Sequence, residues 1–215
     1  MNKIAIYGAG GFGREVKMLI DQINNNNKQY EFIGFFDDGF LKGTVINNFE
    51  VLGGISELNN YSNKIQIVLA LANPIVKKKL LYSIKNNNVT FPKLIHPNCL
   101  IGEDNVIIGE GAIICAGTII TVNIEIGDHV ILNLGCTVGH DTKIGSYTSL
   151  MPSVNISGEV EIGSAVYFGT GAKIINQINI GEGTIVGAGA VVSKSLPPNC
   201  TAVGIPAKPI KYHNE

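Results

Sequence analysis

The pair His140-Asp141 is the place in the chain where neighbouring side chains are best suited to acid–base chemistry. A neutral imidazole accepts a proton near pH 7, and an adjacent carboxylate fixes its tautomer and raises its basicity. Such a pair could remove a proton from an attacking amine or hydroxyl. The alternative interpretation is a solvated turn with no chemical role. The other three histidines are weaker candidates: His96, His129 and His213.

A second pattern with chemical meaning is the glycine-rich turn at residues 8–13, Gly-Ala-Gly-Gly-Phe-Gly. Its glycines permit a tight turn and the close approach of a pyrophosphate to a helix N-terminus. Asp37 and Asp38 follow about 25 residues later, at the end of a second apolar run. Alone, this pattern suggests NAD, but the first half of the chain has only about 95 residues, too few for the usual dinucleotide fold. A structural strand–helix bend is the other interpretation.

The composition indicates a folded protein. Of its 215 residues 45% are hydrophobic and only 15% are charged, which supports a core and excludes extensive disorder. A net charge of -1 argues against nucleic-acid binding. No apolar run reaches the length of about 18 residues that would span a membrane. Four cysteines without a C-x-x-C spacing and no recognisable signal peptide favour a cytoplasmic protein.

The first half, residues 1–94, predicts an α/β domain with a small parallel sheet. Short apolar runs alternate with segments of helical periodicity. The basic run Lys77-Lys78-Lys79 falls within the second helical segment, and we interpret it as a solvated helix face. The expected strands cover residues 4–7, 32–36 and 65–71, and the expected helices cover residues 14–24 and 75–85.

The second half, residues 95–215, is dominated by a six-residue repeat. From Ile108 to Val192, every sixth residue is apolar at all fifteen positions, and the residue two before each is small or β-branched. Glycine follows the apolar residue in eight of the fifteen repeats. This period fits neither an α-helix nor an ordinary strand, but it fits a short strand plus a turn, wound around a coil. The phase slips once, because Ile101 stands seven residues before Ile108.

Three such sides make a triangular coil of eighteen residues, so residues eighteen apart form columns. His140 then lies one coil below Gly158, at about the strand spacing of 4.8 Å. A glycine N–H can approach a thioester oxygen closely and stabilise the oxyanion that forms there. The sequence therefore brings a candidate base and a candidate oxyanion donor together.

The repeat resembles that of the [LIV]-G-x-x-x-x hexapeptide transferases, whose fold is a left-handed parallel β-helix. The stretch from Val138 to Gly145, Val-Gly-His-Asp-Thr-Lys-Ile-Gly, is similar to the V-x-H-[DE]-x-x-I-G stretch of the bacterial sugar acetyltransferases related to the sialic-acid O-acetyltransferase NeuD. The resemblance implies a Rossmann-like half domain followed by a left-handed β-helix. It also implies that His140 is the general base and that Asp141 supports it.

The same resemblance implies the remaining site residues. Acetyl-CoA is expected along the later coils, where Gly204-Ile205-Pro206-Ala207-Lys208 resembles the family's usual ending. The glycine turn is expected to face the nucleotide of a nucleotide-linked sugar, although Phe12 departs from the small residue or histidine often found there. No metal is expected, because only His140 is placed as the zinc-binding histidines of the related γ-type carbonic anhydrases are. The implied acetyl-CoA residues are Ser149, Gly158, Thr170 and Ala188, and the implied substrate residues are Gly10, Gly11, Phe12, Asp37, Asp38, Ala72 and Asn73.

The expected function is N-acetylation of a UDP- or dTDP-linked 4-amino-4,6-dideoxy sugar for surface glycan synthesis. The amine would attack acetyl-CoA directly, in a homotrimer whose cleft lies between neighbouring coils. O-acetylation of sialic acid or another sugar hydroxyl is a second interpretation. An inactive nucleotide-binding solenoid that serves as a scaffold is a third.

Overall fold

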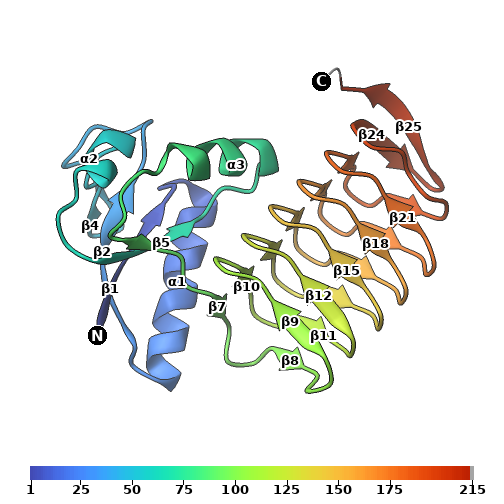
Figure 1. Ribbon diagram of the computed structural model, residues 1–215, viewed down its shortest axis with the longest axis horizontal. Coiled ribbons are helices and arrows are strands. Elements are labelled where there is room, and N and C mark those ends of the chain that lie inside the picture. Colours follow the sequence, from blue (N-terminus) through green and yellow to red (C-terminus); the bar gives the residue numbers. More distant parts are fainter. Residues whose placement is uncertain (214–215) are drawn as a thin grey trace.

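The computed structural model describes residues 1–213, which form an α/β unit followed by a long parallel β-helix (Figure 1). The α/β unit contains a four-stranded parallel sheet in the order β2-β1-β5-β6 and a separate hairpin of β3 and β4. Its elements are β1 (Asn2–Tyr7), α1 (Gly11–Asn26), β2 (Tyr30–Phe36), β3 (Val45–Ile46), β4 (Phe49–Glu50), α2 (Ile55–Asn59), β5 (Ile65–Leu69), α3 (Pro74–Ser83) and β6 (Val89–Thr90).

The sequence predicted the three main strands and both long helices of this unit, because each buries an apolar face. On α1 the buried residues recur at helical spacing, at Val16, Leu19, Ile20 and Ile23. Three differences are evident. Helix α1 begins at Gly11 and takes in the glycines of the turn, and α3 ends at Ser83. The short elements β3, β4, α2 and β6 carry too few residues to show a period.

The β-helix has three sides, and successive coils pair in parallel. We call these sides C, D and E. Side C contains β7 (Leu94–Ile95), β10 (Ile113–Ile114), β13 (Ile131–Leu132), β16 (Ser149–Leu150), β19 (Tyr167–Phe168), β22 (Ile185–Val186), β24 (Cys200–Gly204) and the antiparallel β25 (Ala207–Tyr212). Side D contains β8 (Leu100–Ile101), β11 (Ile119–Ile120), β14 (Thr137–Val138), β17 (Asn155–Ile156), β20 (Lys173–Ile174) and β23 (Val191–Val192). Side E contains β9 (Val106–Ile108), β12 (Ile124–Ile126), β15 (Lys143–Ile144), β18 (Glu161–Ile162) and β21 (Asn179–Ile180).

The six-residue repeat has the predicted structural role. All of its apolar positions except Ile108 are buried in the core of the prism, and Ile108 packs against that core. The pairing confirms the single slip of phase: Ile108 pairs with Ile126, eighteen residues on, whereas Ile101 pairs with Ile120, nineteen residues on. The extra residue therefore lies in the first coil, before the eighteen-residue columns become regular.

Side C of the β-helix faces the α/β unit. Ile113, Cys115 and Ile131 from this side share one apolar cluster with the buried face of α1. Figure 1 shows α3 beside the same coils, at the upper edge of the sheet. No helix within residues 1–213 is both long enough and apolar enough to cross a membrane.

Candidate active site at the corner of the prism

His140 lies at the corner where side D turns into side E, directly after β14. Asp141 has a φ of 56°, a left-handed conformation that aspartate tolerates better than most residues. The turn brings the two side chains together, with His140 Nδ1 at 2.8 Å from Asp141 Oδ2. Both side chains remain about half exposed. The imidazole therefore points out of the prism, as the column argument requires.

Asp141 is held from a second direction by Asn123, which the sequence analysis missed. The Asn123 side-chain amide donates a hydrogen bond of 2.9 Å to Asp141 Oδ1, and the Asn105 amide in turn donates to Asn123. The hydrogen bond from His140, followed by that from Asn123, lowers the pKa of Asp141. The signal was present in the sequence, because residues 105, 123 and 141 are spaced eighteen apart.

This arrangement fixes the roles of the two imidazole nitrogens. An ionised Asp141 accepts a hydrogen bond from the protonated Nδ1, which leaves the lone pair of Nε2 free to act as a base. The contact with Asp141 therefore assigns the tautomer with the proton on Nδ1. Nε2 is directed toward Gly158, one coil further along.

Gly158 stands against the ring of His140. A Cβ at this position would lie 2.4 Å from His140 Nε2, so only glycine leaves room for the imidazole. Among residues 1–213, the Gly158 N–H donates no hydrogen bond. Other turn residues of this column share that property, but only at Gly158 does the free N–H stand beside an imidazole.

The four residues proposed for acetyl-CoA lie on three different parts of the prism. Thr170 and Ala188 are exposed at the corner between sides C and D, and the Thr170 carbonyl accepts a hydrogen bond from the residue after Ala188. Gly158 lies at the corner between D and E. Ser149 is buried on side C, beneath α3. Within one copy these residues do not form one surface, and the burial of Ser149 counts against a contact with a ligand there.

The glycine turn at residues 8–13 joins β1 to α1. Gly10 caps α1, and the N–H of Ala9 donates to Asp37 Oδ2 at 2.8 Å. A Cβ on Gly13 would lie 1.8 Å from the Gly8 carbonyl oxygen, so the last glycine of the motif is required for close packing of helix on turn. Gly10 and Gly11 remain exposed and could approach a ligand.

Phe12 has a different environment from that expected. It is partly buried and packs against the apolar cluster shared by α1 and side C. Packing against this cluster therefore accounts for a large apolar side chain at this position. Contact between Phe12 and a substrate stays a prediction.

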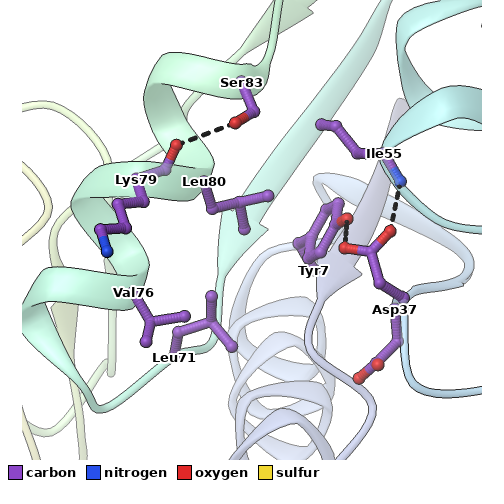
Figure 2. Close-up of a pocket in the computed structure, with 9 residues that line it drawn as sticks. Tyr7, Asp37, Ile55, Leu71, Val76, Lys79, Leu80 and Ser83 are labelled. Atoms are coloured by element: carbon purple, nitrogen blue, oxygen red, sulfur yellow. Dashed lines mark hydrogen bonds between the residues drawn. The ribbon is translucent and has the colours of Figure 1, made fainter.

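Asp37 and Asp38 line a cavity of about 370 Å³ at the carboxyl ends of β1 and β2 (Figure 2). Asp38 accepts hydrogen bonds from the Tyr7 hydroxyl at 2.5 Å and from the Ile55 N–H at 2.9 Å. Burial, and then the Asp38 carboxylate, raise the pKa of Tyr7. Figure 2 shows Val76 and Leu80 of α3 on the opposite wall, with the Lys79 amino group directed away from Tyr7.

A larger groove of about 910 Å³ lies between α3 and the coils. Ala72 and Asn73 line it, and Asn73 also caps α3 by accepting from the N–H groups of Ile75 and Val76. Lys79 lines both this groove and the smaller cavity. His213, one of the weaker histidine candidates, also lines the groove, and its Nε2 lies 3.0 Å from Thr201 Oγ1. The two cavities are thus neighbours on either side of Lys79.

The interpretation of the lysine run was wrong for Lys77, which has no exposed surface. Its Nζ lies 3.0 Å from Ser149 Oγ, and burial lowers its pKa to about 7. Lys78 and Lys79 are exposed, as expected. No group of three or more His, Cys, Asp or Glu side chains within residues 1–213 is arranged to hold a metal ion.

Comparison with known proteins agrees with this architecture. Residues 3–84 match the family model described as PglD N-terminal domain. WeeI from Acinetobacter baumannii AYE has 36% identity, a TM-score of 0.88, and coverage of 98% of this chain and 100% of its own. The chain belongs to the NeuD-like family of bacterial sugar acetyltransferases.

Two further similar proteins have names that include their substrate. A mutant of perosamine N-acetyltransferase from Caulobacter crescentus, in complex with CoA and GDP-perosamine, has 27% identity, a TM-score of 0.86 and coverage of 98% of both chains. GDP-perosamine N-acetyltransferase of Escherichia coli O157:H7 is 34% identical over 123 residues, which are 57% of this chain and 55% of that protein. The chain thus spans about half the length of this curated relative.

Proposed function

We propose that the protein is an acetyl-CoA-dependent N-acetyltransferase that acts on the amino group of a nucleotide-linked sugar. The observation that carries the proposal is the His140 imidazole, supported by Asp141 and held against Gly158 on the corner of the β-helix. Its family membership and the relatives crystallised or named with CoA and GDP-perosamine support the substrate class.

The proposed reaction is direct transfer within a ternary complex. The substrate nitrogen attacks the carbonyl carbon of the thioester, the carbonyl oxygen gains negative charge, and the Gly158 N–H donates a hydrogen bond to it. His140 Nε2 accepts the proton that the nitrogen loses. The tetrahedral species then collapses to an amide and expels the CoA thiolate, which takes a proton from the imidazolium. Asp141 keeps Nδ1 protonated throughout.

The two cavities beside α3 suit the two ends of the proposed substrate. The smaller one has the dimensions of a nucleoside, and its carboxylates would repel phosphate, so we assign it to the base and ribose. Lys79 lies between the cavities and offers a positive charge to the diphosphate. The larger groove would then receive the sugar, and the imidazole that meets its amino group would be His140 of a neighbouring copy, because His140 does not line this groove within one copy. The sequence predicts UDP or dTDP as the nucleotide, whereas the two relatives are named with GDP-perosamine, so the assay below compares all three nucleotides.

A homotrimer is part of the proposal, because one copy leaves the site incomplete. His140 and Asp141 are about half exposed, and none of the principal cavities formed by residues 1–213 is lined by them. Thr170 and Ala188 lie at a different corner from Gly158. Packing of prisms side by side would bring a corner of one copy against a corner of the next, with acetyl-CoA between them. Sedimentation that shows a fully active monomer would contradict this.

The decisive test is a thiol-release assay with acetyl-CoA against UDP-, dTDP- and GDP-linked 4-amino sugars and free sialic acid. We expect thiol release with an amino sugar, and none when the His140→Ala variant replaces the wild type. Release with free sialic acid alone would favour O-acetylation. Binding of acetyl-CoA without release on any substrate would favour the inactive scaffold.

A further inference from the structure

Lys77 on α3 and Ser149 on β16 form a buried polar contact that the proposed chemistry does not use. The two residues are 72 positions apart in the chain, and both are completely buried. Lys77 Nζ donates to Ser149 Oγ at 3.0 Å. The contact therefore joins the helix beside the nucleotide cavity directly to side C of the β-helix.

This contact is unfavourable as a contribution to stability. An ammonium group offers three donors, and within residues 1–213 only Ser149 accepts a hydrogen bond from Lys77 Nζ. Burial, and then the nearby charge of Lys77, lower the pKa of His129 to about 4. The buried Nδ1 of His129 has no hydrogen-bond partner among the described residues. Apolar residues of similar volume in such places are often neutral or stabilising. Because this buried polar pair costs stability, its presence suggests that it fixes one arrangement of α3 against the β-helix.

The element that this pair fixes is one wall of the larger groove. Asn73, Lys78 and Tyr82 line the groove from the α3 side, and Tyr167 and Ile185 line it from side C. Ile75 and Tyr82 on α3 are more than half exposed, so the helix does not seal its length against the coils. A shift or rotation of α3 would change the width of the groove and move Lys79.

We propose that the Lys77–Ser149 hydrogen bond is a positioning contact, which sets the distance between α3 and the β-helix and thereby the affinity of the groove for the sugar end of the substrate. The proposal rests on the proposed function for the identity of that substrate. The effect of the hydrogen bond on the position of α3 does not depend on the proposed function. Lys77 touches no reacting atom, so it acts through α3.

The test uses Lys77→Met, which keeps most of the apolar stem, and Ser149→Ala, which leaves the amine unpaired. We expect each variant to raise KM for the nucleotide-linked amino sugar about three- to tenfold, the range of one lost hydrogen bond, with KM for acetyl-CoA changed less than about twofold. The double variant should be no worse than the poorer single variant, because the two residues act as a unit. Lys85→Met, just beyond the end of α3, is the matched control.

A second measurement separates this proposal from the proposed function. Amide hydrogen exchange across residues 74–83 of the ligand-free protein should be about three- to tenfold faster in Ser149→Ala than in the wild type and in Lys85→Met. If the wild type acetylates no amino sugar, the proposed function fails, and the exchange rates still decide whether the pair holds α3. Unchanged exchange in Ser149→Ala, equal increases in both KM values, or effects that multiply in the double variant would each overturn the positioning role.

Discussion

Two polar pairs, one on the prism and one between the prism and α3, illustrate opposite ways of placing a side chain. His140 and Asp141 are adjacent in sequence, lie at an exposed corner, and are oriented by a turn and by residues eighteen apart. Lys77 and Ser149 are 72 residues apart, lie between the two units, and have no exposed surface. The first pair is determined by a local repeat, whereas the second exists only because two units pack together. We therefore expect the first to control chemistry and the second to control geometry.

The largest effect should come from removing the base. His140→Ala deletes the imidazole that accepts the substrate proton, and turnover should fall at least about 10²-fold. The variant should fold normally, because the side chain is about half exposed. Steady-state kinetics checks the result. Near-normal turnover would remove the proposed mechanism.

A smaller but still large effect should come from Gly158→Ala. The added methyl group would occupy the space 2.4 Å from His140 Nε2, so the ring must rotate away and the base is displaced. We expect a fall in kcat on the order of tenfold to 10²-fold, with the melting temperature nearly unchanged. Asn176→Ala, in the same column one coil further, is the control. Equal losses in both variants would mean that the corner is sensitive to any change.

We expect Lys77 to make the free energy of unfolding depend on pH. Its pKa is about 7 when folded and about 10.5 when exposed, so the unfolded chain binds more protons between these values. Lys77 therefore lowers the free energy of unfolding as pH falls from 10.5 to 7, because the unfolded chain gains a proton that the folded chain does not. The free energy of unfolding of the wild type, relative to Lys77→Met, should rise from pH 7 to about 8.5, below the titration of unfolded cysteine thiols. Parallel pH curves for the two proteins would show that Lys77 is not buried in this way.

The smallest effect should follow loss of the support behind the carboxylate. Asn123→Ala removes one of the two hydrogen bonds that lower the pKa of Asp141. Asp141 and its contact with His140 remain, so we expect kcat to fall only about two- to fivefold. The acidic limb of the pH–rate profile should move to higher pH. Asn105→Ala, one coil earlier, should shift this limb less. An unchanged profile would show that His140 alone orients Asp141.

The sequence by itself determined the β-helix and the corner at which His140 meets Gly158. The period of six places one apolar residue per strand in the core, and the period of eighteen places His140 beside Gly158, because coil geometry converts sequence spacing into spatial distance. Asn123 could have been found by the same rule. Both long helices and the main strands of the first unit were predictable from their buried faces.

Only the tertiary structure decided how the two units meet. Lys77 lies in a run of three lysines that looks solvated, and Ser149 stacks between the larger residues Ile131 and Tyr167 of neighbouring coils. Neither pattern in the sequence indicates that these two side chains meet. The partial burial of Phe12 against the apolar cluster that holds residues of both units was likewise not visible in the sequence. Local periodicity reports which face of an element is apolar, but it does not report which partner covers that face. Whether the Lys77 amine is buried depends on which surface packs against α3. Only the packed arrangement of the two units shows that surface.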